Sequence, residues 1–165
     1  VGIIGYGNNG KEFAQALSSL NVPVLAHDKY KTGFSEGVIK ESSIEEIFQK
    51  ATLISFHVPL TEETAYMADY QFFKSFKTPV LVINISRGKI LKTKDLINAL
   101  DEGFVLGAAL DVLDEESKSF TIEDKNNVLV DLNNRPNVII TPHVAGWTKE
   151  SYFKLSDVLA DKIIK

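Results

Sequence analysis

The chain contains no cysteine, no membrane-length apolar stretch and no run of basic residues. The first absence excludes disulfide bonds and thiol chemistry, and it fits a reducing compartment. The second leaves no segment that spans a bilayer. With 18 Lys and Arg against 22 Asp and Glu, the formal charge is −4, so no electrostatic footprint for nucleic acid or an anionic membrane is present. No signal peptide or lipidation motif is visible, and we expect a cytoplasmic protein without a metal site.

A length of 165 residues with 44% hydrophobic content suits one globular domain over 1–165. The chain starts inside an apolar strand pattern and without Met, so we expect a piece of a longer protein. Short β-branched runs alternate with helical patterns along its length, which is typical of a parallel sheet covered by helices on both faces. The predicted fold class is therefore α/β, a doubly wound parallel sheet (Rossmann fold) in three α/β/α layers.

The individual elements follow from periodicity and from start and stop signals. Strands are expected over 1–4, 22–26, around Val38, and over 52–56, 80–83, 107–110 and 138–140; helices are expected over 11–20, 43–50, 70–76, 93–102 and 149–164. Ser43 with Glu46 forms a capping box, Thr93 is expected to cap its helix, and Gly103 follows that helix. The polar stretch 114–136 is expected to be a loop.

A glycine-rich turn joins the first strand to the first helix. Gly5 suits a tight turn, Gly7 lets the backbone approach a pyrophosphate, and Gly10 lets the helix pack on the strand. The next apolar run ends at Asp28, 18 positions after Gly10, where a carboxylate accepts hydrogen bonds from the adenosine ribose. An ordinary turn is the alternative for three glycines alone, but strand, helix and acid together favour a dinucleotide site, with NAD preferred over NADP because Asp28 repels a 2′-phosphate.

Other polar residues also follow predicted strand ends, which meet at the ligand-binding edge of such a sheet. Arg87 lies in Ser86-Arg87-Gly88, and its planar fork suits a substrate carboxylate; the alternative is a surface arginine in a turn. His143 follows the last strand and can exchange a proton with a carbonyl oxygen, although most lone histidines are structural. Glu116 would favour the charged imidazole if it lies near His143. Composition alone does not choose among Asp114, Glu115 and Glu116.

The combined motifs resemble the cofactor domain of the D-isomer-specific 2-hydroxyacid dehydrogenases. They are Gly5-x-Gly7-x-x-Gly10 with Asp28, His57-Val58-Pro59-Leu60-Thr61, Asn84-x-Ser86-Arg87-Gly88, Gly107-Ala108-Ala109-Leu110-Asp111-Val112 and Thr141-Pro142-His143, and they span nearly the whole chain. The resemblance implies that Arg87 binds the oxo acid, His143 is the acid/base, Glu116 orients it, and Asp111 helps to hold the nicotinamide amide. It also implies that the substrate domain is absent from this chain.

The resemblance further implies which residues contact NAD. They are Gly5, Gly7, Asn8, Asn9, Gly10, Asp28, His57, Val58, Pro59, Thr64, Ile85, Ser86, Arg87, Asp111, His143 and Gly146. The expected partner is a small 2-oxo or 2-hydroxy acid, with 3-phosphohydroxypyruvate/3-phosphoglycerate first and hydroxypyruvate or glyoxylate next. The alternative is a dinucleotide-sensing interaction protein, as the related corepressors are. A homodimer is also expected, with the apolar residues of 66–76 either in its interface or in the core.

Overall fold

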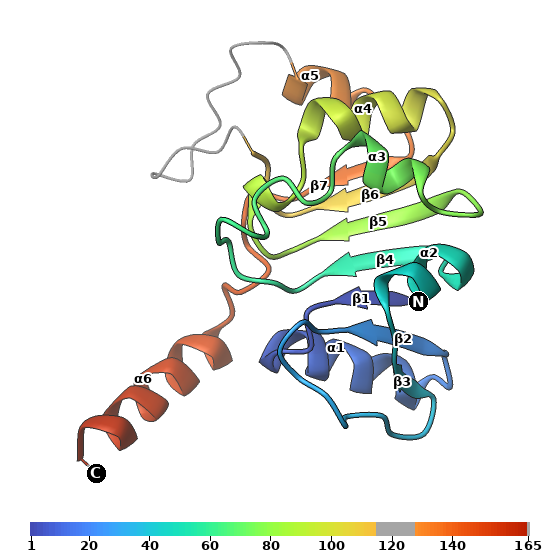
Figure 1. The fold of residues 1–165 in the computed structure, drawn as a ribbon. Coiled ribbons are helices and arrows are strands. Elements are labelled where there is room, and N and C mark those ends of the chain that lie inside the picture. The colour runs from blue at the N-terminus through green and yellow to red at the C-terminus, as the bar shows by residue number, and fades with distance from the viewer. Residues whose placement is uncertain (115–127, 165) are drawn as a thin grey trace.

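The computed structural model describes residues 1–114 and 128–164. A seven-stranded, wholly parallel sheet in the order β3-β2-β1-β4-β5-β6-β7 forms the centre (Figure 1). The strands are β1 (Gly2–Ile4), β2 (Val24–His27), β3 (Ile39–Glu41), β4 (Leu53–Phe56), β5 (Val80–Asn84), β6 (Val105–Leu110) and β7 (Val138–Ile140). This is the Rossmann-like α/β fold that the alternating pattern predicts.

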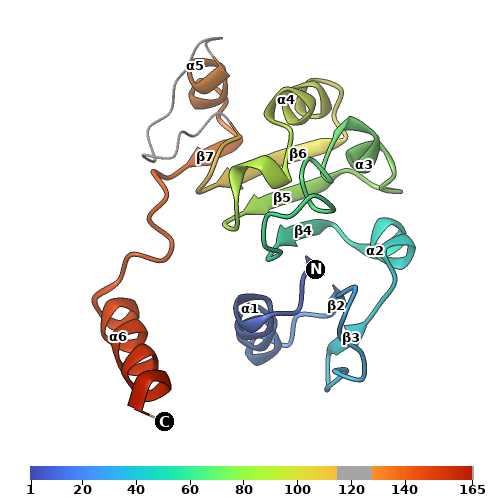
Figure 2. The ribbon, with the colours of Figure 1, turned by 60° about the vertical axis from the view of Figure 1, so that its left-hand side comes forward.

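Helices lie on both faces of the sheet. They are α1 (Asn8–Ser19), α2 (Ile44–Lys50), α3 (Tyr70–Lys74), α4 (Thr93–Asp101), α5 (Val128–Asn133) and α6 (Lys149–Ile164), with a short 3₁₀ turn, η1 (Gly88–Ile90). α1 lies on one side of the sheet, and α2, α3 and α4 lie on the other (Figure 2). Neighbouring residues of β1 point to opposite faces: Ile3 joins a small core with Ala14 of α1, whereas Ile4 joins the larger core beneath α2–α5. The strand order reverses between β1 and β4, the place where open α/β sheets bind ligands.

Most element boundaries differ from the predicted ones by one to three residues, and α1 begins inside the glycine loop at Asn8. Ser43 caps α2 as expected and accepts a hydrogen bond from the Glu46 N–H at 3.2 Å. The prediction for Thr93 is wrong, because Lys92 precedes α4 without a capping side chain. The Thr93 hydroxyl and N–H instead donate to the carboxylate of Asp114 from the end of β6.

One further expectation is corrected. The stretch 114–136 is not all loop, since α5 occupies Val128–Asn133 and buries Val128 and Leu132; residues 115–127 lie outside the described part.

The apolar residues of 66–76 are expected either in an interface or in the core. Phe72, Phe73 and Phe76 are buried in the core beneath α2–α5, whereas Tyr66 is 42% exposed.

α6 lies apart from the sheet in both views and has no buried residue (Figures 1 and 2). Its apolar side chains, among them Phe153, Leu155 and Leu159, are exposed. Among the helices in residues 1–114 and 128–164, none combines the length and apolar character needed to cross a membrane.

Candidate active site

The predicted site residues follow the carboxyl ends of six strands. Gly5 follows β1, Asp28 follows β2 and His57 follows β4; Ile85 to Arg87 follow β5, Asp111 follows β6, and Thr141 to His143 follow β7. Parallel strands end at the same edge of a sheet, so segments far apart in the sequence share this edge. The fold therefore brings the nucleotide and the catalytic motifs to one side of the molecule.

The glycine loop has the shape that its three positions require. Gly5 has φ +94°, and a Cβ there would lie 2.8 Å from the His57 carbonyl oxygen. A Cβ on Gly10 would lie 2.0 Å from the Gly5 carbonyl oxygen, so only glycine lets α1 start this close to β1. Gly7 has nothing within 4 Å of its Cβ position. This open space at the start of a 12-residue helix suits a phosphate, which the helix N–H groups would bind.

Asp28 ties the end of β2 to the glycine loop. Its Oδ2 accepts from the Tyr6 N–H at 2.8 Å, and its Oδ1 accepts from the N–H groups of Tyr30 and Lys31 at 2.9 and 3.0 Å. Burial alone would raise the pKa of Asp28, but these three hydrogen bonds and the nearby Lys31 charge lower it below its ordinary value. The carboxylate is thus fixed in its charged form, and its remaining lone pairs are available to ribose hydroxyls.

A hollow of about 390 Å³ lies between the first turn of α1 and the carboxyl ends of β4 and β5. Seven of the predicted cofactor residues line it, together with Leu60, which the prediction omitted. The seven are Asn9, His57, Val58, Pro59, Ile85, Ser86 and Arg87. The structure thus brings the turn after β4 and the Arg87 turn together against the first turn of α1. The lining mixes apolar side chains with one guanidinium, as a cofactor and oxo-acid site requires.

His57 is the most perturbed titratable group of this hollow. Its Nε2 lies 2.9 Å from the Ser55 hydroxyl, its ring packs on Phe13, and its buried Nδ1 has no hydrogen-bond partner among the described residues. Burial lowers the pKa of His57 to about 4. The ring is therefore neutral near pH 7, and it does not add positive charge beside Arg87.

Asn84, a residue outside the predicted site, shapes the turn that carries Arg87. Its buried side chain donates to the Arg87 carbonyl oxygen at 3.1 Å and accepts from the Ser86 N–H and hydroxyl at 3.1 and 3.0 Å. A Cβ on Gly88 would lie 1.9 Å from the Leu113 carbonyl oxygen, so this turn packs directly on the chain leaving β6. The Arg87 side chain itself is exposed, and its guanidinium is directed by a 2.6 Å bond to the Ser86 carbonyl oxygen. A polar residue at the end of an otherwise apolar strand is the sequence feature that could have identified Asn84.

Asp111 organises the loop that carries His143. Its buried carboxylate accepts from the Thr141 hydroxyl at 2.5 Å and from the N–H groups of Val144 and Ala145 at 2.9 and 3.0 Å. The Asp111 carbonyl oxygen also accepts from the His143 N–H at 2.9 Å. These contacts give Asp111 a structural role that the sequence did not indicate; its expected contact with the nicotinamide amide stays a prediction.

The remaining predicted residues fall into three groups. Glu116 lies outside the described residues; Asp114, one of its two rivals, binds Thr93 at the start of α4 and is thereby engaged elsewhere. Thr64 closes its own turn by donating to the Pro59 carbonyl oxygen at 2.6 Å. Asn8, the first residue of α1, and Gly146, whose carbonyl oxygen accepts from the Ser151 hydroxyl at 2.5 Å, are exposed at the binding edge.

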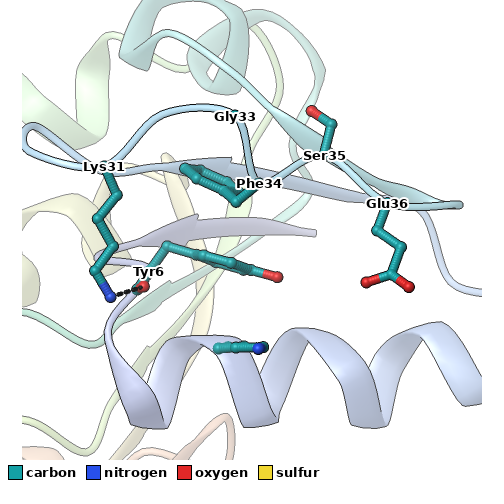
Figure 3. Close-up of a pocket in the computed structure, with 7 residues that line it drawn as sticks. Tyr6, Lys31, Gly33, Phe34, Ser35 and Glu36 are labelled. Atoms are coloured by element: carbon teal, nitrogen blue, oxygen red, sulfur yellow. Dashed lines mark hydrogen bonds between the residues drawn. The ribbon is translucent and has the colours of Figure 1, made fainter.

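A second hollow, of about 430 Å³, lies between the start of α1 and the loop after β2. Figure 3 shows the ring of Phe34 stacked on that of Tyr6, with centroids 4.1 Å apart, and the Lys31 ammonium bonded to the Tyr6 carbonyl oxygen at 3.0 Å. Lys31 and Asp28 together thus bind both backbone groups of Tyr6. The loop after β2 is in this way fixed to the glycine loop.

Comparisons with known proteins agree with this geometry. The family model for the NAD-binding domain of D-isomer specific 2-hydroxyacid dehydrogenases matches residues 1–145. D-lactate dehydrogenase of Streptococcus agalactiae serotype III is 35% identical over 159 residues, which are 92% of this chain and 48% of that protein. Glyoxylate reductase of Pyrococcus furiosus is 32% identical over 166 residues, 99% of this chain and 47% of that protein. The chain thus spans about half the length of these relatives.

Solved structures show the same likeness. The NAD-complexed D-isomer specific 2-hydroxyacid dehydrogenase of Lactobacillus delbrueckii ssp. bulgaricus superposes with a TM-score of 0.88 at 31% identity, covering 99% of this chain and 53% of that one. D-lactate dehydrogenase of Lactobacillus jensenii with NAD⁺ gives 0.87 at 32% identity, covering 98% and 51%. Fold, motifs and family model agree, and the chain belongs to the D-isomer specific 2-hydroxyacid dehydrogenases, of which it forms the NAD-binding domain.

Proposed function

We propose that the complete protein is an NAD-dependent dehydrogenase that transfers hydride between NADH and a small 2-oxo acid. The observation that carries this proposal is the hollow in which Arg87 meets the first turn of α1 and the turn after β4. A guanidinium at the cofactor site can grip a substrate carboxylate with two parallel hydrogen bonds and hold the carbonyl carbon near the nicotinamide.

His143 supplies the proton that the carbonyl oxygen needs when hydride arrives at carbon, and it takes the proton back in the reverse direction. Glu116 is proposed to hold the imidazole in its charged form; the engagement of Asp114 with Thr93 leaves Glu115 as its rival. The cofactor supplies the hydride, and this chain supplies orientation and charge. Asp28, by repelling a 2′-phosphate, favours NAD over NADP, and equal affinity for NADH and NADPH in a titration would refute that role.

The names of the relatives change the order in which we propose the candidate substrates. The family resemblance placed 3-phosphohydroxypyruvate/3-phosphoglycerate first, whereas similar proteins are named D-lactate dehydrogenase and glyoxylate reductase. We therefore place pyruvate and glyoxylate ahead of hydroxypyruvate and 3-phosphohydroxypyruvate. NADH oxidation by the complete native protein against these four acids tests the proposal. Rapid turnover of one acid is expected; absence of turnover with all of them, despite NADH binding, would favour the sensing role.

The proposed partners are the small oxo acid and a second copy of the protein. Phe72, Phe73 and Phe76 lie in the core, so a dimer interface would be formed by other side chains. Sedimentation of the native protein as a monomer would refute the dimer.

A further inference from the structure

The loop after β2 is attached on its outer side to the turn after β4. The Lys29 ammonium lies 2.6 Å from Glu63 Oε1, and the Tyr30 hydroxyl donates to Glu63 Oε2 at 2.7 Å. The two strands that precede these segments, β2 and β4, are the neighbours of β1 on either side. The contacts therefore span the carboxyl end of β1, from which the glycine loop starts.

The side chains that make this connection are largely exposed. The side chains of Lys29 and Glu63 are 62% and 52% exposed, and Tyr30 is 78% exposed. Hydrogen bonding to Glu63 raises the pKa values of Lys29 and Tyr30, and hydrogen bonding to Lys29 lowers that of Glu63. Each group is thus stabilised in the protonation state that makes the contact: Lys29 as an ammonium, Tyr30 as a neutral phenol and Glu63 as a carboxylate.

Both ends of the connection are anchored. The Tyr30 and Lys31 N–H groups bind Asp28, and the Lys31 ammonium binds the Tyr6 carbonyl oxygen. On the other side, the Thr64 hydroxyl accepts from the Thr61 N–H at 2.8 Å and donates to the Pro59 carbonyl oxygen at 2.6 Å. Two internally bonded turns are therefore joined to each other through one carboxylate, that of Glu63.

The place of this connection indicates its use. In a doubly wound sheet the adenosine ribose lies at the end of the second strand, and the ligand crosses the point where the strand order reverses. The adenosine half of NAD would thus lie between the loop after β2, which carries Lys29 and Tyr30, and the turn after β4, which carries Val58, Pro59 and Glu63. The distance between these two walls sets how closely they contact the base.

We propose that Lys29, Tyr30 and Glu63 form a clasp that holds the two walls of the adenosine site together, with Glu63 as a positioning residue for NAD binding. The proposal rests on the assignment of this edge to NAD. Because the walls are held before the ligand arrives, less freedom is lost when it binds. Each exposed contact of this kind changes an equilibrium by a factor of about two to five.

The test compares three ligands on the complete native protein and its variants: NADH, ADP-ribose, which has the adenosine half, and reduced nicotinamide mononucleotide, which lacks it. Glu63→Ala removes both contacts and should weaken ADP-ribose and NADH about fivefold, whereas Glu63→Gln keeps an acceptor for Tyr30 and should weaken them about twofold. The mononucleotide affinity should not change, and the thermal midpoint of the free protein should fall only slightly, since the lost contacts are exposed. Glu62→Ala, an equal loss of charge at the adjacent exposed residue, is the matched control.

The salt dependence of ADP-ribose binding is a second measurement, and a purely structural role of Glu63 would not change it. The difference in ADP-ribose affinity between wild type and Glu63→Ala should shrink as ionic strength rises, because exposed ion pairs are screened. The clasp is overturned if Glu63→Ala and Glu62→Ala bind ADP-ribose alike, if Glu63→Ala binds it more tightly, or if the mononucleotide is weakened equally. Failure of the wild type to bind ADP-ribose would instead refute the underlying assignment of this edge to NAD.

Discussion

The backbone N–H of His143 donates to the carbonyl oxygen of Asp111 over 2.9 Å, while the Asp111 carboxylate holds the residues on both sides of this histidine. His143 has φ +55°, in the left-handed region that L residues rarely adopt. That conformation costs on the order of 1 kcal/mol and persists where the surrounding contacts impose it. Asp111 provides those contacts, so the proposed acid/base is positioned by a residue of the neighbouring strand end.

Asp111→Ala should therefore weaken both stability and turnover. Removal of the buried acceptor leaves the N–H groups of Val144 and Ala145 without their partner, and we expect a loss of about 2–4 kcal/mol in the free energy of unfolding. Urea unfolding and kcat are the measurements. Asp157→Ala, an exposed aspartate on α6, is the control, and a result equal to that control would show that Asp111 does not hold the loop.

Alanine at Gly7 should weaken NADH binding, whereas alanine at Gly10 should lower the stability of the fold. The Gly7 Cβ position is open and its φ is −73°, so Gly7→Ala should fold normally and yet bind NADH at least about tenfold more weakly, because the methyl group occupies the pyrophosphate space. Gly10→Ala places a methyl group 2.0 Å from the Gly5 carbonyl oxygen. It should lower the free energy of unfolding by about 2 kcal/mol or more. Unfolding curves and NADH titrations of both variants check this pair; similar behaviour of the two would refute it.

Fold and cofactor motifs could be predicted because they depend on local signals. Apolar runs, glycine spacing and acids at strand ends give the sheet, the glycine loop and Asp28. Asn84 and Asp111 show what local signals miss. Their structural roles come from hydrogen bonds to turns whose positions only the folded chain sets, as does the contact between Asp114 and Thr93. α5 escaped prediction because a helix of two turns among polar residues shows little periodicity.

Stability should depend on pH through His57. The folded state holds its pKa at about 4, whereas an unfolded histidine titrates near 6.5. Between these values the unfolded state binds more protons, so the free energy of unfolding should fall as pH drops from about 6.5 towards 4, by up to about 3 kcal/mol. Urea unfolding at pH 5 and pH 8 measures this loss in wild type and in His57→Gln. An equal pH dependence in both proteins would show that another group is responsible.

Arg87→Lys should act mainly on the oxo acid. Lysine keeps the charge but loses the planar fork, so KM for the oxo acid should rise by about tenfold or more while the NADH affinity changes little. Steady-state kinetics and an NADH titration separate the two effects. Lys89→Arg, at an exposed cation two positions away, serves as the control. An unchanged KM in Arg87→Lys would remove Arg87 from the carboxylate site.

The most direct test of the account is a comparison of NADH binding and NADH oxidation in wild type and His143→Ala, with whichever oxo acid the native protein turns over best. Loss of the proton donor should reduce kcat by about a hundredfold or more and leave the NADH dissociation constant nearly unchanged, since His143 acts on the carbonyl oxygen. If His143→Ala kept most of its rate, His143 would not be the acid/base and the proposed mechanism would be wrong.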